Sequence, residues 1–174
     1  MNLIKNLLFS VLLGTTFVYT ANSQEVGQAI APCVLSQLNT SEPVDLKSFE
    51  GQVVYIDFWA SWCPPCVKSF PFLNGLHNQY HSEGLRVIGI NLDEVTEDAT
   101  RFASKNPVDF MLAKDNTKSC AKDLGVIAMP TSYLIDRKGV IRHIHLGFRS
   151  GQADELHKQV QLLLSESAVK SPVS

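Results

Sequence analysis

The sequence has no excess of charge of either sign, no internal repeat and no low-complexity tract. Its 174 residues include 15 basic and 17 acidic ones, for a formal net charge of −2. Because proteins that bind nucleic acids carry clustered basic charge, this balance gives no indication of a nucleic-acid partner. With 45% hydrophobic and 18% charged residues, the composition is ordinary for a globular protein. The length suffices for one compact domain with a sizeable core.

The N-terminal region lacks an apolar run long enough to be a clear membrane span. Residues 7–19 are mostly apolar, whereas a transmembrane helix needs about 20 apolar residues. A short apolar run after a single basic residue, Lys5, is typical of a secretory signal peptide. We therefore predict a signal peptide over residues 1–23, with an uncleaved anchor as the alternative, and a mature domain over residues 24–174. We expect this domain in the periplasm or at the extracytoplasmic face of the membrane.

Apolar patterning in the first half predicts two strands joined by a helix. The β-branched and aromatic run 53–59 and the run 85–92 each favour a strand buried on both faces. Apolar residues between them follow helical spacing, at Val67, Phe70, Leu73, Leu76 and Tyr80. A strand–helix–strand unit implies parallel pairing with a right-handed crossover.

The rest of the chain predicts shorter elements around this unit. Residues 24–43 resemble an extension with several turn residues. After residue 95 the pattern favours a helix over 96–105 capped by Thr96, a strand over 108–113, a helix over 119–124, hairpin strands over 131–136 and 140–146, and an amphipathic helix over 153–165. The fold class is therefore α/β.

Cysteine occurs at only four positions, and two of them form a motif. In Cys63-Pro64-Pro65-Cys66 the cysteines are three residues apart, where a buried strand is expected to turn into a helix. A disulfide closes easily across the first helical turn, and the helix dipole favours the thiolate, which is the attacking species. A zinc half-site is the alternative, but the chain offers no second Cys/His pair at matching spacing. We expect a redox dithiol, with no metal and no other cofactor.

Cys33 and Cys120 lie far from this motif, on either side of it. In an oxidising compartment thiols pair, and an even number permits complete pairing. We predict a structural disulfide between Cys33 and Cys120 that ties the N-terminal segment to the domain. Two separate buried thiols are the alternative.

Asp57 is an acidic residue in the middle of an apolar strand, six residues before Cys63. Desolvation should raise its pKa toward that of a useful proton acceptor. We predict that it deprotonates Cys66 late in the exchange, directly or through water. A carboxylate simply held by a hydrogen bond is the alternative.

Two histidine pairs have spacings that metal sites also use. His143 and His145 alternate along a strand, while His77 and His81 are one helical turn apart. Isolated pairs of this kind are more often solvated surface residues, which is the interpretation we favour for both.

Two segments resemble the thioredoxin superfamily. Residues 53–66 (VVYIDFWASWCPPC) resemble the active-site strand and motif of thioredoxins, and residues 125–136 (GVIAMPTSYLID) are similar to their cis-proline segment. Pro71 matches the proline that kinks their second helix. Together with the export signal and the added helix and strand, these motifs resemble the TlpA/ResA branch over residues 30–165.

The resemblance implies a thioredoxin-like fold, with a central mixed β-sheet flanked by helices and an inserted helix–strand unit after the βαβ motif. It also implies an extracytoplasmic protein-disulfide reductase, with Cys63 as nucleophile, Cys66 as resolving thiol and Pro130 in a cis bond beside them. Trp62, Met129 and Pro130 are then the expected substrate-binding residues. The implied partners are a disulfide-containing exported client and a membrane-bound thiol-disulfide electron donor, with the protein acting as a monomer.

Three positions depart from the family pattern. The lysine that accompanies the buried acid in thioredoxins aligns with Gly89 here. Thr131 stands where the cytochrome-c maturation branch usually has an acidic residue, and Cys33 stands where many relatives have Asp.

The same residues bear on three other functions. A copper-binding or copper-centre assembly module would hold Cu(I) through both thiolates, which are soft ligands. A peroxiredoxin-type peroxidase uses an isolated cysteine, and a purely structural role does not explain a dithiol at a helix tip.

Overall fold

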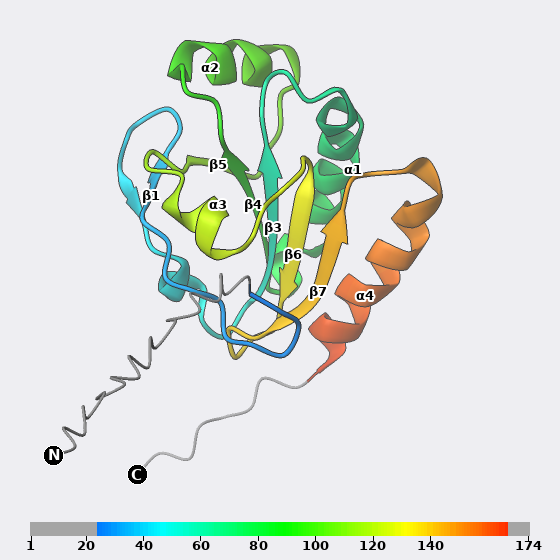
Figure 1. Cartoon of the computed structure of the whole chain (residues 1–174). Coiled ribbons are helices and arrows are strands. Elements are labelled where there is room, and N and C mark those ends of the chain that lie inside the picture. Colours follow the sequence, from blue (N-terminus) through cyan, green and yellow to red (C-terminus); the bar gives the residue numbers. More distant parts are fainter. Residues whose placement is uncertain (1–23, 167–174) are drawn as a thin grey trace, which may run out of the picture.

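The computed structural model describes residues 24–166, so the predicted signal peptide lies outside the described residues. A seven-stranded mixed sheet runs through the molecule in the order β2-β1-β5-β4-β3-β6-β7 (Figure 1). Its strands are β1 (Leu35–Gln37), β2 (Pro43–Val44), β3 (Val53–Trp59), β4 (Leu85–Asn91), β5 (Met111–Lys114), β6 (Thr131–Ile135) and β7 (Ile141–Leu146).

The centre of the sheet is parallel and its margins are antiparallel. β3, β4 and β5 run in one direction, while β6, β7 and β1 each pair antiparallel to a neighbour. The carboxyl ends of parallel strands meet at one edge of a sheet, so the segments that follow Trp59, Asn91 and Lys114 emerge together. Ligand and catalytic residues in open α/β sheets gather at this edge.

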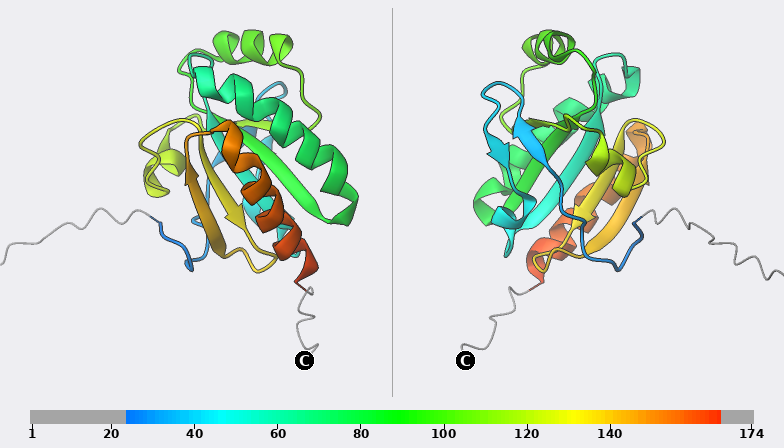
Figure 2. Two further views of the ribbon diagram at one scale, coloured as in Figure 1. Left: turned by 90° about the vertical axis from the view of Figure 1, so that its right-hand side faces the viewer. Right: turned by 60° about the vertical axis from the view of Figure 1, so that its left-hand side comes forward.

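Residues 24–166 form four α-helices around the sheet, and 3₁₀ turns lie over Leu46–Phe49, His81–Glu83 and Ser150–Gln152. The helices are α1 (Pro64–Tyr80), α2 (Thr96–Lys105), α3 (Ser119–Asp123) and α4 (Ala153–Ser165). α1 and α4 cover one face of the sheet and α3 the other, while α2 lies beyond one end (Figures 1 and 2). No helix among residues 24–166 is long and apolar enough to cross a membrane.

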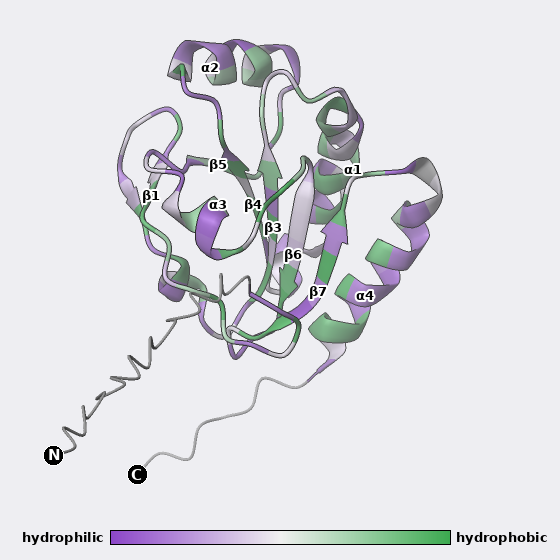
Figure 3. Cartoon of the chain, viewed as in Figure 1, coloured by the Kyte–Doolittle hydropathy of each residue, from purple (hydrophilic) through white to green (hydrophobic). Residues whose placement is uncertain are grey.

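β3 contributes side chains to both clusters of the hydrophobic core, one on each face of the sheet. Its continuous apolar sequence predicted a strand buried on both faces. Alternate side chains point to opposite faces of a strand. Tyr55 and Trp59 pack in the cluster under α1 and α4, whereas Ile56 and Phe58 pack in the cluster under α3. The amphipathic pattern that predicted α4 is visible as alternating apolar and hydrophilic residues along that helix (Figure 3).

Several predicted details were wrong. α2 begins after Val95, which makes no side-chain cap; Thr96 is the first helical residue, and its hydroxyl instead accepts a hydrogen bond from the Lys114 ammonium. Val67 is exposed, because the buried stripe of α1 runs through Cys66 and Phe70. The segment predicted as an extension contains β1 and the first residue of β2. The strand predicted over 108–113 is β5, shifted toward the C-terminus.

Cys33 and Cys120 form a disulfide in the structure, with Cα atoms 4.9 Å apart. It joins the segment before β1 to α3, two regions separated by 87 residues in sequence. Cys120 is completely buried, whereas Cys33 is only half-buried. The bond therefore fastens the N-terminal segment to the face of the sheet that α3 covers.

The double substitution Cys33→Ala/Cys120→Ala should lower the free energy of unfolding by up to about 4 kcal/mol, because the long loop is no longer closed in the unfolded chain. Urea unfolding of the oxidised proteins measures this change. Cys63→Ala/Cys66→Ala is the matched control, since that disulfide closes a loop across a separation of only 3 residues and should stabilise less. Equal unfolding midpoints for the wild type and the Cys33/Cys120 variant would contradict the prediction.

Candidate active site

The Cys63–Cys66 pair lies at the start of α1, directly beyond the carboxyl end of β3. The chain leaves β3 at Trp59 and turns through Ala60, whose carbonyl accepts a hydrogen bond from the Cys63 N–H at 3.1 Å. Cys63 has extended backbone angles and is the N-cap of α1. Its sulfur is bonded to that of Cys66, with Cα atoms 5.4 Å apart. A buried strand that turns abruptly into a helix thus presents the motif at the edge of the sheet.

The two prolines alter the electrostatics expected at this helix start. Pro64 and Pro65 occupy the first two helical positions, where a missing N–H costs little. Cys66 supplies the only N–H of the first three helical residues, and it donates to the Cys63 carbonyl at 3.1 Å. The first three helical residues therefore leave no unpaired N–H group near the Cys63 sulfur. The helix dipole remains as the backbone contribution that favours a thiolate there.

Both cysteines of the disulfide are buried. Cys66 has no exposed surface, and Cys63 is only 3% exposed. Trp62, the preceding residue, is 67% exposed. Of the two sulfur-bearing residues, only Cys63 therefore retains contact with solvent, and it does so beside a large apolar side chain.

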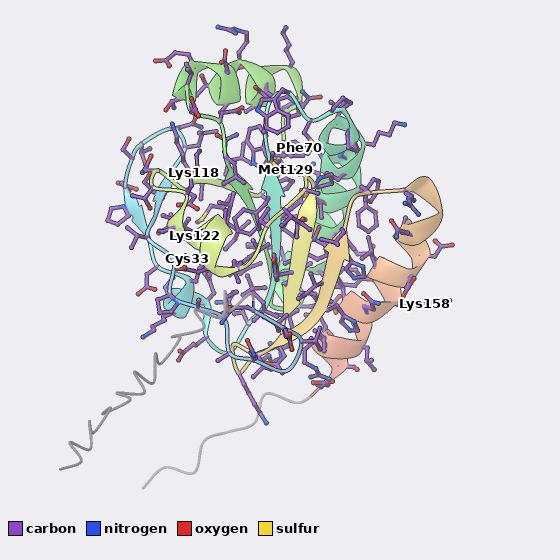
Figure 4. All side chains as sticks on the ribbon, in the orientation of Figure 1. Cys33, Phe70, Lys118, Lys122, Met129 and Lys158 are labelled. Atoms are coloured by element: carbon purple, nitrogen blue, oxygen red, sulfur yellow. A yellow bond between two sulfur atoms is a disulfide. The ribbon has the colours of Figure 1, made fainter. Side chains whose placement is uncertain are left out.

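The Met129–Pro130 peptide bond is cis, as the resemblance implied, and it leads directly into β6. The Pro130 carbonyl accepts the Gly147 N–H at 2.7 Å. Met129 packs against the core cluster that contains both cysteines of the motif and Phe70 (Figure 4). The cis-proline segment and the dithiol thus meet across one apolar cluster.

Asp57 is buried in β3, on the face that α1 covers, and is 1% exposed. The Ser132 hydroxyl donates to its Oδ1 at 2.6 Å, and the Ser69 hydroxyl lies 3.4 Å from its Oδ2. Burial raises the pKa of Asp57 to about 7, and the two serine hydrogen bonds oppose this increase. A carboxyl group with such a pKa can exchange a proton near neutral pH.

Ser69 connects Asp57 to the dithiol helix. Its hydroxyl also lies 3.1 Å from the Cys66 carbonyl, so its single proton is donated to only one of the two acceptors at a time. The Ser69 hydroxyl therefore lies between the Asp57 carboxylate and the backbone carbonyl of Cys66.

Gly89 explains why no lysine accompanies this acid. It pairs with Asp57 across β3 and β4. A Cβ atom on Gly89 would lie 2.9 Å from Leu112 Cδ2 and 3.2 Å from Phe110 Cε2, so any side chain would require repacking. Without a cation at this position, no charge from β4 offsets the desolvation of Asp57.

A polar group at the same edge of the sheet was missed in the sequence. Asp93, 4% exposed, accepts hydrogen bonds from the Ser61 N–H at 2.9 Å and from the Ser61 hydroxyl at 3.0 Å. Asn91 Nδ2 donates to the same carboxylate at 2.8 Å. The signal that could have found it is an acid just after a buried parallel strand, next to the strand that carries the motif.

The histidine pairs do not join this site. The rings of His143 and His145 stack with centroids 6.2 Å apart on the edge strand β7, and His145 hydrogen-bonds Gln159 of α4. The rings of His77 and His81 are 4.6 Å apart near the far end of α1. Within the described part of the chain, no group of three His, Cys, Asp or Glu side chains is arranged to hold a metal ion.

Known proteins resemble this chain over most of its length. The family model described as Redoxin matches residues 25–160. A protein named Thiol-disulfide oxidoreductase ResA from Bacillus thuringiensis subsp. konkukian is 33% identical over 137 residues, which cover 78% of this chain and 79% of that protein. The protein of the same name from Halalkalibacterium halodurans is 27% identical, over 91% of this chain and 90% of the relative.

Solved structures of thiol-disulfide proteins also resemble this chain. A protein from Chlorobium tepidum described as a thiol:disulfide interchange protein DsbE superposes with a TM-score of 0.78 at 38% identity, covering 82% of this chain and all of that one. One from Bacteroides thetaiotaomicron described as a protein disulfide isomerase superposes with a TM-score of 0.74 at 27% identity, covering 82% and 91%. These neighbours have the thioredoxin-like fold that the resemblance implied.

Asp57→Asn should change how stability depends on pH. In the folded protein the carboxyl keeps its proton up to about pH 7, while in the unfolded chain it releases it near 3.8. Between these values the unfolded state binds fewer protons, so the stability of the wild type falls as pH rises. Relative to the variant, which cannot ionise there, the wild type should lose up to about 4 kcal/mol across this window.

Urea unfolding of the two oxidised proteins from pH 4 to pH 8 measures this difference. All other carboxyl groups are common to both, so the difference isolates Asp57. A difference in unfolding free energy that stays constant with pH would show that the carboxyl ionises at its ordinary pKa.

Proposed function

Because this chain belongs to the Redoxin family and is a thiol-disulfide oxidoreductase like the ResA and DsbE proteins, we propose that it reduces disulfides of exported proteins through Cys63 and Cys66. The observation that carries the proposal is the pairing of these cysteines at the start of α1, in one cluster with Met129 of the cis-proline segment. Exchange at a redox pair requires one accessible sulfur and one protected sulfur. The exposures of the two residues support this division.

The proposed reaction begins with the reduced form of the pair. The Cys63 thiolate attacks one sulfur of the client's disulfide, which forms a mixed disulfide and releases the other client sulfur as a thiolate. Cys66 then loses its proton and attacks the Cys63 sulfur, which releases the second client thiol. The client gains two electrons, and Cys63 and Cys66 are oxidised to a disulfide. A membrane-bound thiol-disulfide donor would reduce this bond again, and client oxidation would run the same steps backwards.

Asp57 is the proposed acceptor of the Cys66 proton. With a pKa of about 7, Asp57 is partly ionised near neutral pH and can accept a proton there. Ser69 lies within hydrogen-bond distance of both its carboxylate and the backbone carbonyl of Cys66. A carboxyl of ordinary pKa would be a much weaker base toward a thiol. The proton would move directly, or through water admitted when the disulfide opens.

The client is proposed to bind as an extended chain beside Trp62, Met129 and Pro130. Pro130 has no N–H, and its carbonyl is already paired with Gly147. The hydrogen bonds found among residues 24–166 leave the N–H and carbonyl of Met129 unpaired. These two groups could pair with a client backbone, as in β-strand addition, while Trp62 covers apolar side chains of the client.

The proposed setting is outside the cytoplasm, with the protein exported by its N-terminal segment and active as a monomer. All four cysteines are paired in the structure. Disulfides persist in oxidising compartments, so this complete pairing supports an exported protein.

Single cysteine substitutions should separate the two roles. Cys66→Ser keeps the attacking thiolate but cannot resolve, so it should accumulate covalent adducts with clients that dithiothreitol releases. Cys63→Ser should form essentially none and lose disulfide reductase activity. Non-reducing electrophoresis after incubation with a disulfide-containing protein measures both outcomes.

Cys63→Ser/Cys66→Ser is the control, because it retains Cys33 and Cys120 and should trap nothing. Adducts that form with Cys63→Ser rather than with Cys66→Ser would reverse the assignment of roles. If both single variants kept wild-type reductase activity, the proposed function itself would be refuted.

A further inference from the structure

The turn before Cys63 is hydrogen-bonded to the carboxylate of Asp93, which lies outside the turn. Ala60 and Cys63 close the turn through their backbone hydrogen bond, and Ser61 lies inside it. Both donors of Ser61, its N–H and its hydroxyl, are bound by Asp93 at 2.9 and 3.0 Å. Asp93 is 32 residues away in sequence and belongs to the segment after β4. The position of the turn therefore depends on where this segment holds its carboxylate.

The Asp93 segment is itself fixed by a buried hydrogen-bond network. Asn91, completely buried, donates to the Asp93 carboxylate at 2.8 Å and accepts the Asp93 N–H at 3.0 Å. From the other side, the Lys118 ammonium donates to the carbonyls of Leu92 at 2.6 Å and Asp93 at 3.0 Å. Charge-assisted hydrogen bonds of this kind are stronger than neutral ones.

Lys118 is in turn placed by α3. It is the N-cap of that helix and has a φ of 59°, a left-handed conformation that is uncommon for residues other than glycine. The helix is tied to the N-terminal segment by the disulfide between Cys120 and Cys33. Lys118, Lys122 and Cys33 are grouped around α3 in Figure 4. A continuous series of bonds thus runs from the second disulfide to the turn of the first.

We propose that Asp93, held by Lys118, is a positioning residue of the redox dithiol, and that it favours closure of the Cys63–Cys66 disulfide by fixing the turn before Cys63. The proposal rests on the proposed function, in which this pair is the redox centre. Closing a disulfide costs conformational entropy in the reduced chain. A turn already fixed before closure loses less freedom, so the equilibrium constant for closure rises.

The reduction potential of Cys63–Cys66 tests this directly. Equilibration with reduced and oxidised glutathione, in which two protein thiols and one glutathione disulfide yield a protein disulfide and two glutathione thiols, gives the closure constant. The potential of each protein is measured as a function of pH. Wild type and variants are compared in the pH range where the slope of potential against pH shows that two protons are taken up on reduction. Both cysteines are then protonated thiols in the reduced form, so a change of nearby charge has little influence and geometry dominates.

Asp93→Ala should lower the closure constant between threefold and tenfold, and a tenfold change corresponds to a potential about 30 mV higher. Ser61→Ala, which leaves every charge in place and removes only the hydroxyl donor, should lower it by a smaller factor in the same direction. Lys118→Met should also lower it at least threefold. Because Asp93 and Lys118 act in series, the double variant should show less than the sum of the two single effects.

Lys122→Met is the matched control, a loss of the same charge from an exposed position on the same helix, and should leave the closure constant unchanged. If Asp93→Ala and Ser61→Ala lower the melting temperature while the closure constant stays at the wild-type value, Asp93 has only a structural role and the inference is wrong. The inference is also wrong if Lys118→Met changes the closure constant no more than Lys122→Met does. A wild-type protein whose Cys63–Cys66 pair cannot be reduced and reoxidised would refute the proposed function instead.

Discussion

The structure around the dithiol depends on one buried carboxylate. Asp57 lies in the middle of the central strand, and its two oxygens face hydroxyl groups from two different elements: Ser69 of α1 and Ser132 of β6. The carboxylate therefore connects the helix that carries Cys66 to the strand that follows the cis-proline. Burying such a group is unfavourable unless hydrogen bonds or protonation compensate. Its raised pKa is the direct result of incomplete compensation.

The parallel arrangement of β3 and β4 explains why the remaining polar groups gather nearby. Both strands end at the same edge, so the turn to Cys63 and the segment with Asp93 emerge side by side. The α1 face of the sheet holds the dithiol cluster, and the α3 face holds Cys120 with its partner Cys33. The two disulfides thus lie on opposite faces and are connected through the polar edge between them.

The fold was largely predictable because its central elements carry long, regular patterns. β3 and β4 are nearly continuous apolar runs, and α1 has apolar residues at helical spacing. Asp57 was conspicuous as a charge within an apolar strand. β1 and β2 were missed because each has three residues or fewer. β2 pairs only with β1, and β1 joins the main sheet through β5, which is distant in sequence. The role of Asp93 depends on a contact between residues far apart in sequence, which no local pattern indicates.

The proton acceptor role of Asp57 is the central claim of the mechanism. The most direct measurement is the rate at which Cys66 resolves a mixed disulfide on Cys63, followed in single-turnover experiments across pH for the wild type and Asp57→Asn. The wild-type rate should contain a component that rises through about pH 7, where Asp57 ionises, and the variant should lack it. Identical pH profiles for the two proteins would show that Asp57 does not accept the Cys66 proton.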